Sequence, residues 1–272
     1  MRGWWREIAG LVLPVACGGC GRPRTELCPS CAAVLTGATE GARGARRVRP
    51  SPEPAGLPVV HAVAPYDAAV RELLLAHKER GALGLARPLG GALAVAVEAA
   101  AGPVEGSAAR PLLLVPVPSS RRSVRARGHD PTRRVALAAA ARLRSTGRRA
   151  RVVPVLRQRR YVADQAGLGA RGRLANLSGA LEVVPGGGRL LGAGRVVLVD
   201  DLMTTGASLA EAARAVGAVR LPFITGIPHG LPIGSAQRGF EQPVGAVIAS
   251  SPASFEINRN SSRTWIVAGG ER

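Results

Sequence analysis

The chain has 272 residues, which is enough for one α/β domain and a smaller module. Hydrophobic residues make up 46% of it but aromatic residues only 3%, so its core must consist largely of Ala, Val and Leu. The formal net charge of +19 favours polyanions of any kind: nucleic acid, a phosphorylated substrate and an anionic surface all fit it. The arginine-rich segments 43–49 and 142–151 also fit a second interpretation, that of solvated faces.

The N-terminal segment is a poor match to a secretion signal. Its apolar run, residues 8–16, is short and contains Pro14, and Glu7 lies where a signal is purely basic. Lipid attachment at Cys17 would call for Leu at the position of Pro14. No stretch approaches the roughly 20 apolar residues of a membrane span. We therefore expect a cytoplasmic protein without membrane insertion.

All four cysteines fall in one short window, Cys17-x2-Cys20-x7-Cys28-x2-Cys31. Two C-x2-C pairs can offer four thiolates to one tetrahedral Zn²⁺, and the glycines around the first pair give a tight knuckle its backbone freedom. A pair of disulfides is disfavoured because we expect a reducing compartment, and redox C-x2-C motifs rarely come as adjacent doublets. The sequence therefore predicts a zinc-knuckle module at 1–36, whose four thiolates fill the shell of a structural metal.

Beyond the cysteines, the pattern changes from a linker to alternating strands and helices. Gly, Pro and Arg dominate the segment 37–58, which has no apolar periodicity and is expected to be a linker. From 59 to 228 the alternation predicts a parallel sheet wrapped by helices. The expected elements in chain order are a strand at 59–63, helices at 69–79 and 84–101, a strand at 112–118, a helix from Pro131, strands at 152–156 and 196–199, and a helix at 209–216.

The segment R-V-V-L-V-D-D-L-M-T-T-G-A-S, from Arg195 to Ser208, carries the strongest functional signal. Four apolar residues form a central strand, which is followed by two adjacent carboxylates, a turn of small residues and a helix N-terminus. In a parallel α/β sheet, ligands bind at the carboxyl ends of the strands. The turn can present backbone N–H groups to a phosphate, with help from the helix dipole. Carboxylates are poor neighbours for a phosphate but good partners for hydroxyls. A ligand with a sugar diol beside its phosphate would therefore suit both the acid pair and the turn.

This segment resembles the phosphoribosyl pyrophosphate signature of type I phosphoribosyltransferases. Taken with the cysteines, the chain resembles the ComF family of competence-associated phosphoribosyltransferase-like proteins over about residues 14–218. The resemblance implies a type I phosphoribosyltransferase fold over 59–228. The further motifs that carry it are Y-D-x3-R-E-L-L-L-x2-K-x2-G from Tyr66 to Gly81, V-P-V-P-x6-R-x-R-G from Val115 to Gly128, and R-x7-Q-A-x-L-x2-R-x-R-x2-N-L-x-G-A from Arg157 to Ala180.

By this resemblance, Asp200 and Asp201 hold the ribose hydroxyls of phosphoribosyl pyrophosphate and steady the shell of an Mg²⁺ ion through water. Pyrophosphate is expected on the segment 119–127, whose Arg forks suit phosphate oxygens, although a solvated or DNA-facing loop is an alternative interpretation. The segment 157–176 is expected to close over the reacting carbon and exclude water. The implied residues are Thr204, Thr205, Gly206, Ala207 and Ser208 for the 5-phosphate, Arg121, Arg122, Arg125 and Arg127 for pyrophosphate, and Arg157, Gln165, Arg171 and Arg173 for the lid.

Three functions remain open at this point. An enzyme of this kind would displace pyrophosphate from ribose C1 with a nitrogen nucleophile. A DNA-uptake accessory would grip single-stranded DNA with its zinc knuckles and basic loops and contact competence proteins, although the shortage of aromatic residues argues against a stacking platform. A sensor would bind phosphoribosyl pyrophosphate without turning it over.

The composition changes near residue 220. Up to Val219 the chain holds one Ile and no Phe, whereas the rest holds six Ile and all three Phe. The segment 221–227 is apolar enough for a strand at the sheet edge. Beyond Pro228 the pattern has no sustained period. We therefore predict that 229–272 is a foreign tail from a shifted reading frame that packs poorly; a family-specific extension with its own hairpin is the alternative.

Overall fold

A computed structural model of the chain describes residues 15–37, 44–103, 110–160, 170–219 and 242–255. Its centre is a six-stranded sheet with the order β1-β2-β8-β7-β3-β4, parallel except for β1. A separate antiparallel pair joins β5 to β6. The strands are β1 (Arg46–Val48), β2 (Val60–Pro65), β3 (Leu112–Pro116), β4 (Ala150–Val152), β5 (Leu156–Gln158), β6 (Leu181–Val183), β7 (Arg195–Met203) and β8 (Val244–Ser250).

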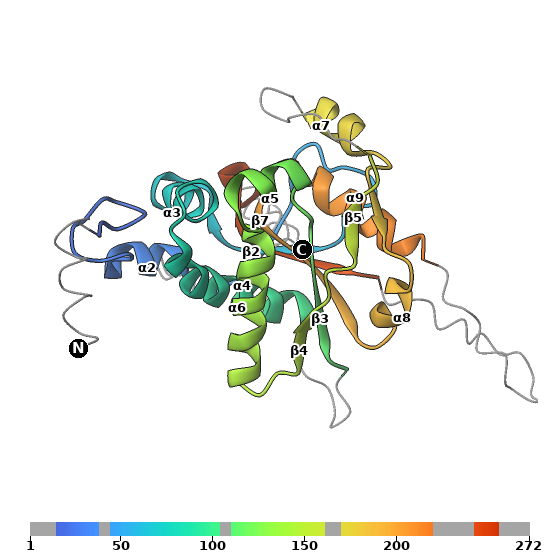
Figure 1. The fold of residues 1–272 in the computed structure, drawn as a ribbon, viewed down its shortest axis with the longest axis horizontal. Coiled ribbons are helices and arrows are strands. Elements are labelled where there is room, and N and C mark those ends of the chain that lie inside the picture. The colour runs from blue at the N-terminus through green and yellow to red at the C-terminus, as the bar shows by residue number, and fades with distance from the viewer. Residues whose placement is uncertain (1–14, 38–43, 104–109, 161–169, 220–241, 256–272) are drawn as a thin grey trace, which may run out of the picture.

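Helices cover both faces of this mostly parallel sheet (Figure 1). α4 and α6 pack against each other and cover one face, whereas α9 packs against β7 and β6 on the other face. The mixed α/β architecture that the sequence predicts is thus present. The helices are α2 (Pro29–Leu35), α3 (Ala68–Glu79), α4 (Ala86–Ala101), α5 (Arg121–Arg127), α6 (Pro131–Ser145), α7 (Ala170–Leu177), α8 (Gly187–Leu191) and α9 (Ala207–Gly217), with the 3-10 turn η1 (Leu83–Leu85) before α4.

The central strands are buried on both sides, as their apolar runs predict. In β3, Leu112 and Leu114 belong to the core under α4 and α6, whereas Leu113 and Val115 belong to the core under α9. Alternate side chains of a strand point to opposite faces, so a run without polar residues is what a covered parallel strand requires. The same alternation continues in β7.

Two short segments differ from the sequence predictions. The predicted strand at 152–156 is two strands, β4 and β5, in separate sheets, because Pro154 lies between them and offers no N–H to a ladder. Within the predicted linker at 37–58, β1 pairs with β2, and Val48 is buried. The segment predicted as a linker therefore contains one short strand, β1.

The prediction of a poorly packed tail is also wrong where the structure describes the tail. β8 lies between β2 and β7, with Val247 opposite both Ala62 and Asp200. Six of its seven residues are buried, and Phe255 beyond it is also buried. A short β-branched and Ala-rich run can fill a central position without the length or periodicity that signals a strand in the sequence. The segment 221–227, predicted as a possible edge strand, lies outside the described residues.

One helical stretch, Leu83–Ala101, is long and apolar enough for a membrane span, with a mean hydropathy of 1.3. In this structure it belongs to the domain core, where Leu89, Leu93 and Val97 are fully buried. α4, which makes up most of the stretch, packs against α6, β2 and β8. Its apolar character is thus accounted for by packing inside the protein.

Candidate functional site

The carboxyl ends of β2, β8, β7 and β3 meet at one edge of the sheet, because these strands are parallel. The segments that follow three of them are α3 after β2, α5 after β3 and α9 after β7 (Figure 1). This edge is where ligands bind in open α/β sheets. The topology therefore brings the predicted diol, phosphate and pyrophosphate segments to the same edge.

The two adjacent acids lie inside β7 and not after it. β3 ends opposite Val199, while β7 continues beside β8 as far as Met203. Asp200 and Asp201 therefore project beyond the end of β3. Asp201 is buried and Asp200 is half-buried, and the Asp201 N–H donates to Asp200 Oδ1 at 2.9 Å. The acids lie at a sheltered strand end, which suits recognition of a ligand more than contact with bulk water.

Lys78, near the end of α3, pairs with one of these acids, Asp201. Its Nζ donates to Asp201 Oδ2 at 3.1 Å, and its side chain is 34% exposed. Lys78 is the only lysine in the chain; all the other basic residues counted in its net charge are arginines. It was not among the predicted site residues, although it is the lysine of the Tyr66–Gly81 motif. The sequence does carry one signal that points to Lys78 as a site residue: it is a single lysine in an arginine-rich chain. A compact ammonium group and a guanidinium fork are not interchangeable.

The charges of this cluster divide the two acids into different roles. Burial, followed by the charge of Asp201, raises the pKa of Asp200 well above its ordinary value. Burial also disfavours ionisation of Asp201, but the charge and hydrogen bond of Lys78 outweigh it and lower the pKa of Asp201. Asp201 is thus the anionic member of the pair, and Asp200 is the member that more readily holds a proton.

The interaction of Lys78 with Asp201 can be tested by measuring the pKa of Lys78 by NMR. Because Lys78 is the only lysine, protein labelled with [¹⁵N]lysine should give a single side-chain ammonium signal. The Asp201 carboxylate raises the pKa of Lys78 above its ordinary value of 10.5, although burial opposes this shift. We expect Asp201→Asn to lower the pKa of Lys78 more than Asp200→Asn does. Glu72→Gln, on the same helix, is the control and should leave it nearly unchanged. An equal Lys78 pKa in the parent and in Asp201→Asn would contradict the pairing.

The turn between β7 and α9 has the geometry of an anion cradle. Gly206 is the N-cap of α9 with φ +75, a conformation that favours glycine, and no side chain caps the helix. The Ala207 N–H has only a long contact of 3.5 Å to Thr205 Oγ1. Thr204 is exposed, and Thr205 and Ser208 are half-buried. First-turn N–H groups without a cap are the donors that bind phosphate at helix N-termini.

A segment of the predicted linker lies against this turn. A Cβ built on Gly206 would lie 3.0 Å from Leu57 Cδ1 and 3.4 Å from Pro50 Cγ. Both contacts come from the chain between β1 and β2. Part of the predicted linker therefore packs against the turn of the candidate site.

The arginines predicted to hold pyrophosphate lie on α5, a short helix capped by Ser120, so the predicted loop is largely helical. Arg127 makes two hydrogen bonds to Glu79, at 2.9 and 2.8 Å, which compensate much of its charge. Arg122 and Arg125 are exposed. The side chain of Arg121 lies outside the described residues. α3 thus contacts both parts of the edge, with Lys78 on β7 and Glu79 on α5.

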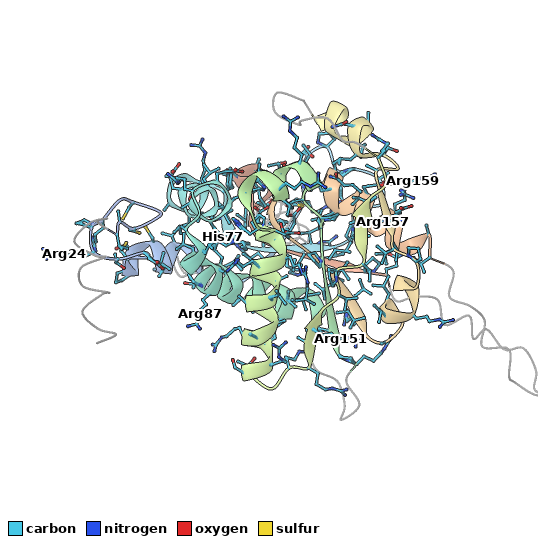
Figure 2. The ribbon with its side chains drawn as sticks, in the orientation of Figure 1. Arg24, His77, Arg87, Arg151, Arg157 and Arg159 are labelled. Carbon is cyan, nitrogen blue, oxygen red and sulfur yellow. The ribbon has the colours of Figure 1, made fainter. Side chains whose placement is uncertain are left out.

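The structure places few of the predicted lid residues. Arg157 lies in β5 and donates from Nε to Glu182 Oε1 at 2.8 Å, far from the cysteine module that carries Arg24 (Figure 2). Gln165 lies outside the described residues. Arg171 and Arg173 lie on α7, and their side chains are not described. Arg157 is therefore held on the two-stranded sheet by an exposed ion pair.

The four predicted metal ligands come together at the N-terminal end of the domain. All four sulfur atoms lie within 4.8 Å of one another, and no two form a disulfide. A tetrahedral zinc site with Zn–S bonds of about 2.3 Å needs sulfurs about 3.8 Å apart. Cys20 is exposed and the other three are buried. The residues are close enough to hold one metal ion.

Backbone donors around the cluster favour thiolates. Burial disfavours the Cys17 thiolate, but N–H groups of the surrounding backbone, including that of Cys28 at 3.3 Å, outweigh it and lower the pKa of Cys17 to about 6. The Cys31 N–H likewise contributes to the lowered pKa of Cys28. Burial raises the pKa of Cys31. A divalent cation would stabilise all four thiolates together.

The cysteine cluster is packed on α3. A Cβ on Gly19 would lie 2.9 Å from the Cys31 sulfur and 3.2 Å from Leu73 Cγ, and one on Gly18 would lie 2.9 Å from Leu85 Cδ1. Three of the cysteines belong to the same hydrophobic core as Leu73. The module is therefore continuous with the helix that carries Lys78.

No protein-family model matches the chain, and no curated protein sequence is significantly similar to it.

Proposed function

We propose that the chain is a ComF-like member of the type I phosphoribosyltransferases that binds phosphoribosyl pyrophosphate at the carboxyl end of β7. One observation carries the proposal. The acid pair Asp200–Asp201 is followed directly by an uncapped helix N-terminus at Gly206, at the edge where parallel sheets bind their ligands. The motif resemblance supplies the identity of the ligand, and the local geometry supports its chemistry.

The two halves of the site suit the two halves of a sugar phosphate. Backbone N–H groups at the start of α9 would hold the 5-phosphate, with the hydroxyls of Thr205 and Ser208 beside them. The carboxylates of Asp200 and Asp201 would accept hydrogen bonds from the ribose 2′- and 3′-hydroxyls. A proton held by Asp200 would also allow it to donate to a hydroxyl oxygen.

Lys78 acts in this proposal as a positioning residue. Its ammonium group keeps Asp201 ionised and oriented at 3.1 Å, and it offsets charge that would otherwise repel a polyphosphate ligand. Lysine has three rotatable donors on one compact group, so a second N–H of Lys78 remains available for a ligand oxygen. The Lys78–Asp201 pair thus balances the charge of the diol site.

The reaction that such a ligand supports is displacement of pyrophosphate from ribose C1 by a nitrogen nucleophile. Bound Mg²⁺ would supply neutralisation of the leaving-group charge, and the Asp200 and Asp201 oxygens are ligands of the kind it prefers. Arg122 and Arg125 on α5 are exposed cations within the predicted pyrophosphate segment 119–127. The chain's own residues would bind and orient the sugar phosphate.

We also propose that Cys17, Cys20, Cys28 and Cys31 hold one structural Zn²⁺. Four thiolates fill a tetrahedral shell and leave no position for a substrate or water. The packing of the cluster on α3 supports a role in positioning that helix.

The test is a calorimetric titration of the full chain with phosphoribosyl pyrophosphate and Mg²⁺. We expect one site per chain in the parent and no measurable binding in the double variant Asp200→Asn with Asp201→Asn. Losing two carboxylates makes the protein more positive, which by itself would strengthen attraction to an anion. A loss of affinity would therefore come from lost contacts of the two acids with the ligand or its Mg²⁺, and not from weaker overall attraction to an anion.

Asp67→Asn with Glu98→Gln is the matched control, because it also replaces two acidic side chains with amides and both residues are exposed. It should bind like the parent. Parent-like affinity in the Asp200/Asp201 double variant, with a parent-like melting curve, would overturn the assignment.

A further inference from the structure

A second charged site lies at the opposite edge of the sheet, at the amino ends of β3, β4 and β7. A hollow of about 510 Å³ opens there beside Pro111, Ala150 and Ala193, which lie at or within two residues of the first residues of these strands. Because the strands are parallel, this edge faces away from the carboxyl ends that carry Asp200 and Asp201. The hollow is thus separate from the proposed sugar-phosphate site.

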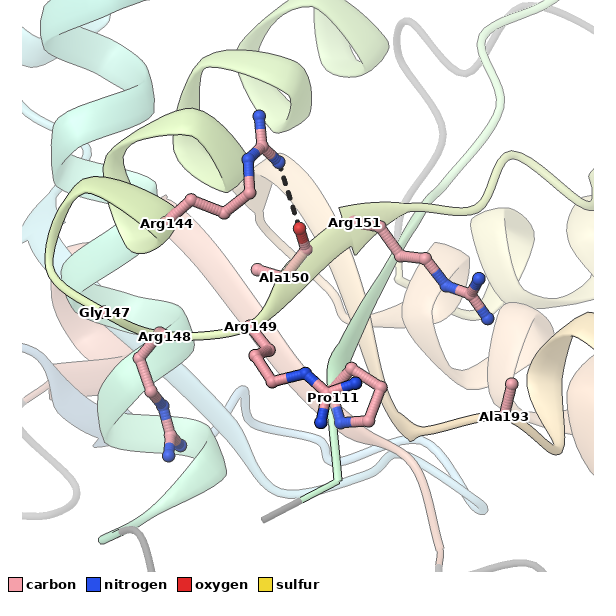
Figure 3. A pocket seen from close by; sticks show the side chains of 8 residues that line it. All are labelled: Pro111, Arg144, Gly147, Arg148, Arg149, Ala150, Arg151 and Ala193. Atoms are coloured by element: carbon pink, nitrogen blue, oxygen red, sulfur yellow. Dashed lines mark hydrogen bonds between the residues drawn. The ribbon is translucent and has the colours of Figure 1, made fainter. Parts of the chain in front are cut away.

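Eight described residues line the hollow; four of them are arginines, and none of the eight is acidic or aromatic (Figure 3). Arg144 donates to the Ala150 carbonyl at 3.0 Å, and Arg148 donates to the Gly102 carbonyl at 3.3 Å. A carbonyl acceptor fixes a guanidinium without cancelling its charge. Each of these groups retains further N–H donors, because a guanidinium has five. Two of the four arginines are therefore held in place and remain cationic.

The other two arginines, Arg149 and Arg151, come from the edge of the sheet. They are two residues apart on extended chain, so they point to the same side of the strand, and Arg151 reaches toward Ala193 (Figure 3). Both side chains are exposed, and neither makes a hydrogen bond or ion pair to another described residue. By contrast, Arg127 and Arg157 are paired with glutamates.

The simplest alternative is that these arginines only compensate the C-terminus of α6. A helix end carries about half of one negative charge, whereas the hollow collects four positive ones. Compensation of the helix dipole thus accounts for a small part of this charge. The remaining positive charges repel one another, and a bound anion would relieve this repulsion.

We propose that this hollow binds an oligophosphate, namely the di- or triphosphate group of a small molecule. Its volume lies in the range of small-molecule sites, about 300–1,000 Å³. Guanidinium forks match phosphate oxygens in pairs, and several of them favour an anion with more than one charge. The eight lining residues that the structure describes include no aromatic side chain to stack on a base, so the phosphates carry the recognition.

Calorimetric titration of the full chain with sodium tripolyphosphate tests this inference. Arg149→Gln with Arg151→Gln should weaken one binding event by about tenfold or more, because the variant removes two guanidinium groups that make charge-assisted hydrogen bonds to phosphate. The matched control is Arg24→Gln with Arg87→Gln, which removes the same charge from exposed residues away from Arg151 (Figure 2). The control, and the Asp200→Asn with Asp201→Asn variant, should retain this event.

Three outcomes would overturn the inference. The parent could bind no tripolyphosphate, or the two arginine pairs could lose affinity equally, which would indicate general charge attraction. In the third, a short oligothymidylate binds through Arg149 and Arg151 while tripolyphosphate does not, which would assign the surface to single-stranded nucleic acid. Thermal melting curves show whether the variants are folded. The four replaced residues, Arg24, Arg87, Arg149 and Arg151, are all exposed, so both double variants should melt like the parent.

Discussion

A chain that ends at Pro228 is expected to be insoluble, or to melt far below the full-length protein. Such a chain lacks β8, which lies between β2 and β7 and donates or accepts ladder hydrogen bonds on both sides. Without it, two strands expose unpaired edges, and these are aggregation sites. Val247 and Ile248 are fully buried, and burial of two such side chains contributes about 3–6 kcal/mol.

That contribution is a large part of the roughly 5–15 kcal/mol by which a domain is stable, so its loss should unfold the protein. A chain that ends at Phe255 retains β8 and every other described element, and it is the matched comparison. Thermal melting and solubility of the three proteins decide the question. If the chain ending at Pro228 melts together with the full-length protein, β8 does not belong to the fold.

Replacement of Cys28 by Ser is expected to remove the metal and to lower the melting temperature by more than about 10 °C. A structural zinc contributes about 10–16 kcal/mol in isolated zinc-finger peptides, and in a domain of this size each kcal/mol corresponds to about 2–4 °C. Cys28 is fully buried within the same core as Leu35 and Leu73. Loosening this core should also displace α3, and with it Lys78, so affinity for phosphoribosyl pyrophosphate should fall.

Ser30→Ala is the control for this variant, because Ser30 is exposed between two of the ligands and offers no thiol. Elemental analysis should find about one zinc per chain in the parent and in Ser30→Ala, and much less in Cys28→Ser. A parent protein with less than about a tenth of a zinc per chain, or a Cys28→Ser variant that melts like the parent, would contradict the metal site.

Residues with strong periodicity or fixed spacing could be assigned from the sequence. The apolar positions of α3 predicted a helix at 69–79, and the helix spans Ala68–Glu79. The prolines around 112–118 marked β3, which spans Leu112–Pro116. The cysteine spacing predicted a cluster that the structure brings together. In each case the local pattern and the packing favour the same structure.

The features that the sequence did not reveal depend on contacts between distant segments. The central position of β8 depends on two partner strands far away in the chain, Val60–Pro65 and Arg195–Met203. The Lys78–Asp201 pair joins residues 123 positions apart, and nothing near Lys78 indicates its partner. Arg127, expected to face pyrophosphate, is held by Glu79, 48 positions earlier. Local propensity carries no information about such pairings.

The most direct test of the proposed function is the position of the ligand in a crystal structure of the full chain with phosphoribosyl pyrophosphate and Mg²⁺. The proposal predicts the 5-phosphate within hydrogen-bond distance of the backbone N–H groups at Gly206, Ala207 and Ser208, with the ribose hydroxyls on Asp200 and Asp201. Density for the ligand at the amino edge of the sheet beside Arg149 and Arg151, and none at the carboxyl end of β7, would contradict it.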